Sequence, residues 1–394
     1  MIIQPITAVL ICLISAYVFA EFFRLLGLPR VVGQISAGLF LGITFKFVTL
    51  SQPSIDTLTF LSDLGIILLF YYVGLETNFK AFSRNIKRSI LISLFNTTIP
   101  FLTGFLVMRY LFYFEMLPSI IIGVSLSVSA QSVSIDILEE MKKLKSKLGN
   151  LVISIGAVDD IIELILVTSL LSIFHFSISN LTLSRLLIDL LIFLFIVVAS
   201  RLWFIPHTLK YFDKEKSSTA RFMGSMIIVL LIASLSEFLG FGLLIGAMIA
   251  GMIVRQTIFK EVNIPNWEEH DIAKSTHIIA FGFLIPLFFI WVGFNTDLTL
   301  IQGNFHLILA FILIAVLGTV GGTIIGTLLG KGSFKEGHML GWGLNPKGDV
   351  ELVIATIALK ASIISPQIFT AIVIMSLFTT IISPIIFKQL AAKY

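Results

Sequence analysis

The sequence predicts an all-α polytopic membrane protein with about thirteen transmembrane helices. Of its 394 residues, 57% are hydrophobic and only 13% are charged, and the mean hydropathy is +1.02. Soluble domains carry about 25% charged residues. The apolar residues gather in stretches of the length that an α-helix needs to cross a bilayer. Composition and pattern together exclude a soluble fold.

Thirteen such stretches follow one another along the chain. The second and the ninth are shorter and rich in glycine, and the gaps leave no room for a soluble regulatory domain. We therefore expect residues 1–394 to form a single transmembrane unit. The stretches begin near Pro5, Val31, Ser54, Lys87, Leu117, Lys147, Thr182, Thr219, Phe241, His277, Phe305, Gly337 and Pro366.

The basic residues predict the orientation of the chain. Of the 27 Lys and Arg residues, all but a few lie in alternate loops on one side, which is the bias expected of cytoplasmic loops. The N-terminus is then outside and the C-terminus is cytoplasmic. Cytoplasmic loops that face anionic lipid also account for the net charge of +4 without any nucleic acid. The single cysteine, Cys12, excludes an internal disulfide.

A weak internal repeat relates the two halves. The segment 33–42 (GQISAGLFLG) is echoed by 242–254 (GLLIGAMIAGMIV), and Val73-Gly74-Leu75 is echoed by Val292-Gly293-Phe294. The offset is seven helices, so the copies have opposite membrane orientations, as in many secondary transporters. The first repeat spans about 5–175, a linker helix about 182–204 and the second repeat about 218–388. Close helix packing also favours such glycine patterns.

The fifth and twelfth helices are predicted to break near the membrane centre. The fifth carries a serine-rich run over 125–134, and the twelfth reads Asn345-Pro346-Lys347-Gly348-Asp349. Proline removes a backbone donor and glycine lowers helix propensity. Broken helices expose carbonyls and helix ends that can coordinate ions. The alternative is a simple proline kink with serines bonded back to their own helix.

Two adjacent carboxylates, Asp159 and Asp160, lie near the middle of an apolar stretch from 148 to 174. A charge at that depth costs several kcal/mol and marks an ion or proton pathway. Glu163 lies one turn further on the same helix, so the three titrations are expected to be coupled. The pattern predicts a cation or proton site with a surplus of negative charge. The other ionisable side chains at mid-depth are Asp349, Glu351 and Lys347.

Together these motifs resemble those of the monovalent cation:proton antiporters, in particular the NapA-like bacterial sodium/proton exchangers and the related Kef-type transporters. The resemblance covers essentially the whole chain. It rests on the segments 28–33 (LPRVVG), 73–76 (VGLE), 159–160 (DD), 246–251 (GAMIAG), 288–293 (FFIWVG) and 345–349 (NPKGD).

The resemblance implies an NhaA/NapA-like fold with two crossed broken helices, a dimerisation domain and a core that moves like an elevator. It implies a secondary transporter and not an enzyme, without a cofactor, and a homodimer in the prokaryotic plasma membrane. In this family the second acid, here Asp160, binds the cation and the proton in competition, with Asp159 beside it. The implied cation is Na+ or Li+, with K+ as the other candidate. The core helices are expected at about 54–76, 87–111, 117–140, 147–174, 277–297, 305–329, 337–360 and 366–388.

The sequence departs from the family pattern at several positions. Members with an acid pair commonly carry a Lys or Arg where this chain has Thr319, so the electrogenic stoichiometry is open. Gln131 replaces the usual Thr beside Ser132, and Glu163 is an added acid. Lys347 replaces an Arg and either supplies the missing cation or pairs with Glu163 or Asp349 as a structural lock. The expected supporting residues are Ser129, Gln131, Ser132, Glu163, Thr319, Lys347 and Asp349.

Three other functions remain as alternatives. A potassium efflux or channel-like protein and a sodium-coupled solute symporter could use a similar scaffold, although no mid-depth Arg is available for a substrate carboxylate. An intramembrane aspartyl protease also needs two acids, but the side chains of Asp159 and Asp160 diverge by about 100° around one helix. Asp160 with Asp349 could still form such a pair.

Overall fold

The computed structural model describes residues 3–44, 50–76, 86–144, 146–179, 191–193, 195–213, 217–261 and 270–393. Within these ranges the chain is helical, and its only β-type pairing is an isolated bridge between Ile3 and Leu50. Nine helices of this described part are long and apolar enough to cross a membrane. Two shorter apolar helices cover Arg30–Thr44 and Leu243–Thr257. An all-helical membrane fold is thereby confirmed.

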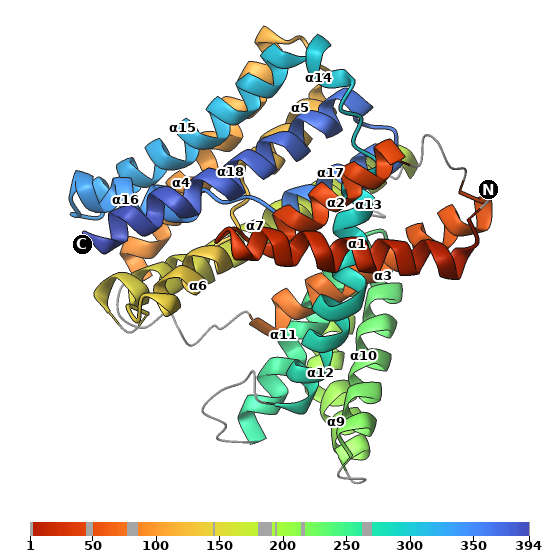
Figure 1. Cartoon of the computed structure of the whole chain (residues 1–394). Coiled ribbons are helices and arrows are strands. Elements are labelled where there is room, and N and C mark those ends of the chain that lie inside the picture. Colours follow the sequence, from red (N-terminus) through yellow and green to blue (C-terminus); the bar gives the residue numbers. More distant parts are fainter. Residues whose placement is uncertain are drawn as a thin grey trace. The chain divides into compact units, whose positions relative to one another are not determined.

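The chain divides into two compact units (Figure 1). The first unit is formed by Met1–Ile55, Asn78–Glu163 and Phe289–Tyr394, and the second by Asp56–Thr77 and Leu164–Phe288. The helices of the first unit are α1 (Pro5–Leu25), α2 (Arg30–Thr44), α4 (Ile86–Leu106), α5 (Met116–Ser127), α6 (Ser132–Glu140), α14 (Leu300–Gly303), α15 (Phe305–Leu329), α16 (Phe334–Leu344), α17 (Val350–Lys360) and α18 (Pro366–Ala392).

The second unit contains α9 (Ile205–Asp213), α10 (Ser218–Phe238), α11 (Leu243–Glu261) and α12 (Asp271–Ile279). Three helices contribute to both units, namely α3 (Gln52–Glu76), α7 (Lys147–Ser179) and α13 (Ile285–Phe294). Three π-helical turns cover Val107–Leu111, Ser200–Phe204 and Ala280–Leu284. The predicted linker helix at 182–204 lies partly outside the described residues, and the helical residues described there continue to Asp213.

Helices α4 and α15 pack closely along much of their length in the first unit (Figure 1). Gly318, Gly322 and Gly326 form one stripe of α15. A Cβ atom at these positions would lie 2.8 Å from Cα of Pro100, 2.3 Å from the carbonyl oxygen of Phe95 and 2.7 Å from Cα of Ile92. Small residues permit this approach of two backbones, which is the usual way for membrane helices to pack. Polar groups of α4 and α15 are thereby brought together.

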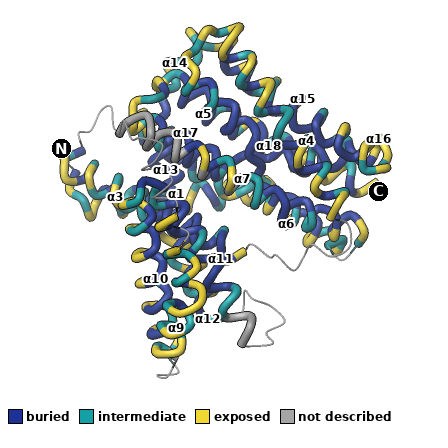
Figure 2. The backbone as a smooth tube through the Cα atoms, turned by 180° about the vertical axis from the view of Figure 1, so that it is seen from behind, coloured by how far each residue is buried: buried dark blue, intermediate teal, exposed yellow. Residues whose placement is uncertain are grey.

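An apolar core joins α4 to α6, α7, α16 and α18. Its largest fully buried side chain is Phe387, and Ile92, Leu138, Val152 and Leu340 are buried around it. Figure 2 shows that α5 is buried along most of its length. Burial of this kind holds the side chains of the first unit in defined rotamers.

Local sequence signals fix where several helices begin. Ser333 accepts from the backbone N–H of Glu336 at 3.2 Å and caps α16. Ser365 caps α18, whose first residue is Pro366. Both helices follow the preference for serine at the N-cap, and α18 also follows the preference for proline in the first turn. Glu336 also forms an ion pair with Arg88 of α4 at 2.6 Å.

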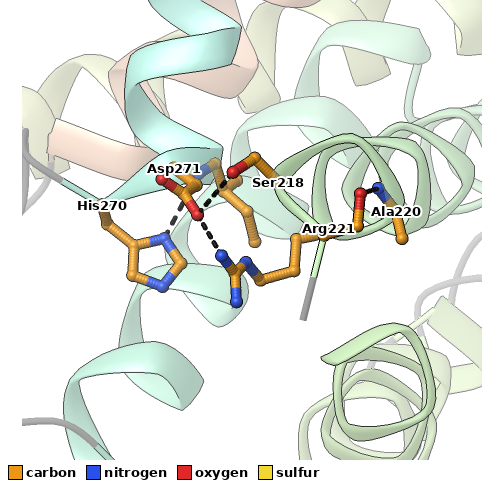
Figure 3. Close-up of polar contacts among 7 residues, drawn as sticks. Ser218, Ala220, Arg221, His270 and Asp271 are labelled. Carbon is orange, nitrogen blue, oxygen red and sulfur yellow. Dashed lines mark hydrogen bonds and ion pairs between the residues drawn. The ribbon is translucent and has the colours of Figure 1, made fainter. Parts of the chain in front are cut away.

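Within the second unit, a polar cluster joins the first turns of α10 and α12 (Figure 3). Asp271 accepts from the hydroxyl of Ser218 at 3.0 Å and forms an ion pair with Arg221. Nδ1 of His270 accepts from the backbone N–H of Ile272 at 3.3 Å. An acid in the first turn of α12 is favourable to the helix dipole. The cluster therefore ties the starts of two helices together.

Candidate ion-binding site

Two helical spans are interrupted, as the serine-rich and Pro-Lys-Gly sequences predict. Residues Val128–Gln131 separate α5 from α6, and Asn345–Asp349 separate α16 from α17. The unwound stretches touch, because the backbone N–H of Ala130 donates to the carbonyl oxygen of Pro346 at 2.7 Å. Helix ends at such a break must find partners outside their own helix. The first unit therefore holds a polar centre within its apolar interior.

Asp159 of α7 is fully buried beside this centre. Its carboxylate accepts from the hydroxyl of Ser93, from Nδ2 of Asn96 at 3.3 Å and from Nε2 of Gln131 at 2.8 Å. Hydrogen bonds to a carboxylate are among the stronger ones in proteins. Three neutral donors thus replace the basic partner that the sequence lacks. They hold Asp159 in one place.

Asn96 of α4 links this carboxylate to the unwound stretch between α5 and α6 and to α15. Its Nδ2 also lies 3.3 Å from Oγ of Ser129, and its Oδ1 accepts from the hydroxyl of Thr323 at 3.1 Å. Asn96 and Thr323 are both fully buried. A saturated network of this kind makes the geometry of the site rigid.

Asp160, the next residue of α7, has a different environment. It is partly exposed, whereas Asp159 is not. Its carboxylate forms no hydrogen bond or ion pair with another residue of the described part of the chain. Consecutive side chains of a helix point about 100° apart, so one acid faces the packed network and the other does not. Of the two adjacent acids, Asp160 is thus the one whose carboxylate has no bonding partner among the described residues.

Lys347 and Glu163 both bind the unwound stretch between α5 and α6. Nζ of Lys347, which is fully buried, donates to the carbonyl oxygen of Val128 at 2.6 Å. Oε1 of Glu163 accepts from the backbone N–H of Ser129 at 2.8 Å. Lys347 forms no ion pair within 4.0 Å with Glu163 or Asp349 in the described part of the chain. The structure therefore does not have the direct ion pair of Lys347 with Glu163 or Asp349 that was one of the two possibilities from the sequence.

The second break, Asn345–Asp349, forms hydrogen bonds with α18, and its last residue is the N-cap of α17. The carbonyl oxygen of Lys347 accepts from the hydroxyls of Ser376, at 2.9 Å, and Thr380. Oγ of Ser376 also lies 2.5 Å from Oε1 of the buried Glu351, so its single hydrogen is shared between the two acceptors. Oδ1 of Asp349 accepts from the backbone N–H of Val350 at 2.8 Å, so Asp349 is the N-cap of α17.

Most of the predicted supporting residues thus lie at the centre, and two lie outside its network. Ser132 is exposed at the start of α6. Thr319 is fully buried in α15, and its hydroxyl has no hydrogen-bond partner among the described residues. The sequence interpretation missed Ser93, Asn96 and Thr323. An asparagine and a serine one turn apart within an apolar span were the available signal.

The chemistry of the centre suits a monovalent cation or a proton. Carboxylate, hydroxyl and carbonyl oxygens are ligands for hard cations. Among the described residues, no group of three or more His, Cys, Asp or Glu side chains is arranged to hold a metal ion. The centre therefore combines the carboxylates of α7 with polar groups of the two interrupted spans.

Comparison with known proteins agrees with this chemistry. A family model described as "Sodium/hydrogen exchanger, transmembrane" matches residues 8–393. A Na+/H+ antiporter of Enterococcus hirae is 28% identical over 384 residues, covering 97% of this chain and 96% of that protein. The Na+/H+-K+ antiporter GerN of Bacillus cereus is 27% identical over 363 residues, covering 92% and 90%.

A solved structure gives the same answer for the fold. The sodium proton antiporter MjNhaP1 of Methanocaldococcus jannaschii superposes with a TM-score of 0.73, covering 99% of this chain and 97% of that one. The sequences are 17% identical. At that identity the match speaks for the fold alone.

Proposed function

Because the chain belongs to the sodium/hydrogen exchanger family, we propose that it exchanges a monovalent cation for protons, and that both compete for Asp160. The observation that carries this assignment is the contrast within the acid pair. Asp159 accepts three side-chain hydrogen bonds, whereas Asp160 forms none with the described residues and is partly exposed. Asp159 supports the site, and Asp160 binds the ion.

The cost of desolvating the carboxylate then couples the movement of the cation to the movement of the proton. A bare carboxylate pays a large penalty on entering an apolar barrier, whereas a carboxylate neutralised by a proton or a cation pays much less. If the core moves only with Asp160 neutralised, each crossing carries one kind of ion and each return carries the other. Exchange follows without any further gate.

The same proposal includes an elevator-like movement, thirteen spans and an inverted repeat, with the N-terminus outside and the C-terminus in the cytoplasm. Glycine contacts support the repeat. A Cβ atom at Gly33 would lie 2.5 Å from the carbonyl oxygen of Phe19, and one at Gly246 would lie 2.5 Å from that of Ile232. These partners precede the two glycines by the same number of residues. A homodimer in the prokaryotic plasma membrane completes the proposal, by analogy with the family.

The wild-type protein in liposomes tests this function. Vesicles with a lumenal pH dye receive an inward Na+, Li+ or K+ gradient, and choline serves as the control. We expect lumenal alkalinisation with Na+ or Li+ and none with choline. K+ is included because GerN is named a Na+/H+-K+ antiporter. An equal response to every salt, choline included, would contradict cation exchange.

The network around Asp159 makes a separate prediction. Asn96→Ala removes one of three donors to a buried carboxylate and leaves Thr323 without its acceptor. We expect the free energy of unfolding to fall by about 1–3 kcal/mol, measured by thermal unfolding of the detergent-solubilised protein. Asn295→Ala is the matched control, because Asn295 is exposed and bonds only within its own helix end. Equal destabilisation by both variants would show that the network is not a support.

A further inference from the structure

One peptide group in the first break is held at both of its ends by charged side chains. The carbonyl oxygen of Val128 and the N–H of Ser129 belong to the same peptide bond. Lys347 donates to the oxygen at 2.6 Å and Glu163 accepts from the N–H at 2.8 Å. The two side chains thus lie at opposite ends of a peptide dipole, and each contacts the end whose partial charge is opposite to its own.

This arrangement explains how a lysine can be fully buried at the site. A buried charge is costly unless it is hydrogen-bonded and opposed by another charge. Glu351, Glu163 and Asp159 are the acids near enough to interact electrostatically with Lys347. Asp159 is already held by Ser93, Asn96 and Gln131. The remaining countercharges are Glu163, through the peptide, and Glu351.

The backbone of Lys347 is fixed independently of its side chain. Its carbonyl oxygen accepts from Ser376 and Thr380 of α18, and the preceding carbonyl, of Pro346, accepts from Ala130. The ammonium group is therefore directed at the first break and not left to swing toward Asp160. Thr319 supplies no second base in α15.

We propose that Glu163 and Lys347 form a positioning pair, which clamps the Val128–Ser129 peptide and keeps the charge of Lys347 from competing with the cation at Asp160. The pair is specific to this site because Glu163 balances a lysine that would otherwise repel the cation. This inference rests on the proposed function and assigns a role to two residues that do not themselves bind the ion.

The experiment compares apparent KM values for Na+ in liposomes for wild type, Glu163→Gln and the double variant Glu163→Gln with Lys347→Met. Glutamine keeps the shape of the side chain and an oxygen that can accept from Ser129, but it removes the countercharge. We expect Glu163→Gln to raise the KM about tenfold, the effect of losing one charge-assisted interaction, with a small change in maximal rate. Removing the lysine as well should return the KM to within about threefold of wild type.

Glu336→Gln is the matched control, because Glu336 is buried to the same degree as Glu163 but pairs with Arg88 away from the breaks. Its KM should equal that of wild type. An unchanged KM in Glu163→Gln, or no recovery in the folded double variant, would overturn the positioning pair. If the double variant does not fold, the KM of Glu163→Gln relative to that of wild type tests the proposal by itself. A wild type without cation-dependent proton movement would instead overturn the proposed function as a whole.

Discussion

Replacing Asp160 with Asn abolishes cation-driven proton movement if this carboxylate is the shared site. Asn keeps the size of the side chain but can hold neither a proton nor the charge that attracts a cation. We expect the exchange rate in liposomes to fall at least about 100-fold, because a charged ligand contributes on the order of 3 kcal/mol. The partly exposed Asp160 has no bonding partner among the described residues, so the substitution breaks no contact that holds the fold.

Asp297→Asn provides the control for this substitution. Asp297 lies in the same unit and accepts from the backbone and hydroxyl of Thr299, which an asparagine oxygen can also do. Its exchange rate should match that of wild type. A folded Asp160→Asn protein that exchanges as fast as the control would remove Asp160 from the mechanism.

Neighbouring glycines of α15 give the second large effect. A Cβ atom at Gly322 would lie 2.3 Å from the carbonyl oxygen of Phe95, whereas one at Gly321 would have no atom within 4 Å. Gly322→Ala should therefore push α15 from α4 and lower the free energy of unfolding by about 3 kcal/mol, the upper end of the usual cost of overpacking. Gly321→Ala should be neutral or stabilise the helix by up to about 1 kcal/mol.

Thermal unfolding of the two variants in detergent measures the difference. The comparison isolates the effect of helix packing, because both variants add the same methyl group, to adjacent residues of α15. Similar melting temperatures for both would mean that α4 and α15 do not approach as closely as the structure has them. The positions of Asn96 and Thr323 relative to each other would then be open as well.

The sequence predicted those parts of the site that carry unusual chemistry for a membrane span. Asp159 and Asp160 stood out because acids are expensive at mid-depth. The break before α17 was predictable from Pro346 and Gly348, since both weaken a helix. The break after Ser127 was harder, because serines also occur within intact helices.

The residues that the sequence analysis missed acquire their role only where helices that are distant in sequence pack together. Ser93 and Asn96 carry no charge and have no motif of their own, and they become donors to Asp159 only when α4 lies against α7. The partner of Lys347 was missed for a different reason. Its neighbours in sequence suggested a carboxylate, whereas the contact between the two breaks offers it a backbone oxygen, that of Val128. Hydrogen bonds to backbone groups leave no signal in residue identity.

The contacts of Asp159 and Lys347 also bear on the absence of a basic residue at position 319 of α15. Members of the family with an acid pair commonly carry a Lys or Arg at this position, where the present chain has Thr319; here Asp159 is satisfied by neutral donors, and Lys347 is engaged by a peptide group. Under the proposed function, a single proton-binding carboxylate at Asp160 suffices for the exchange.

Competition between cation and proton at one carboxylate is the central claim, and the dependence of the apparent KM for Na+ on pH tests it most directly. In liposomes, the KM should fall as the pH rises, by up to about tenfold per pH unit while the proton occupies the site, with a constant maximal rate. At higher pH, where the proton no longer competes, the KM should become constant. A KM that does not change with pH, or a maximal rate that carries the whole pH effect, would contradict a shared site.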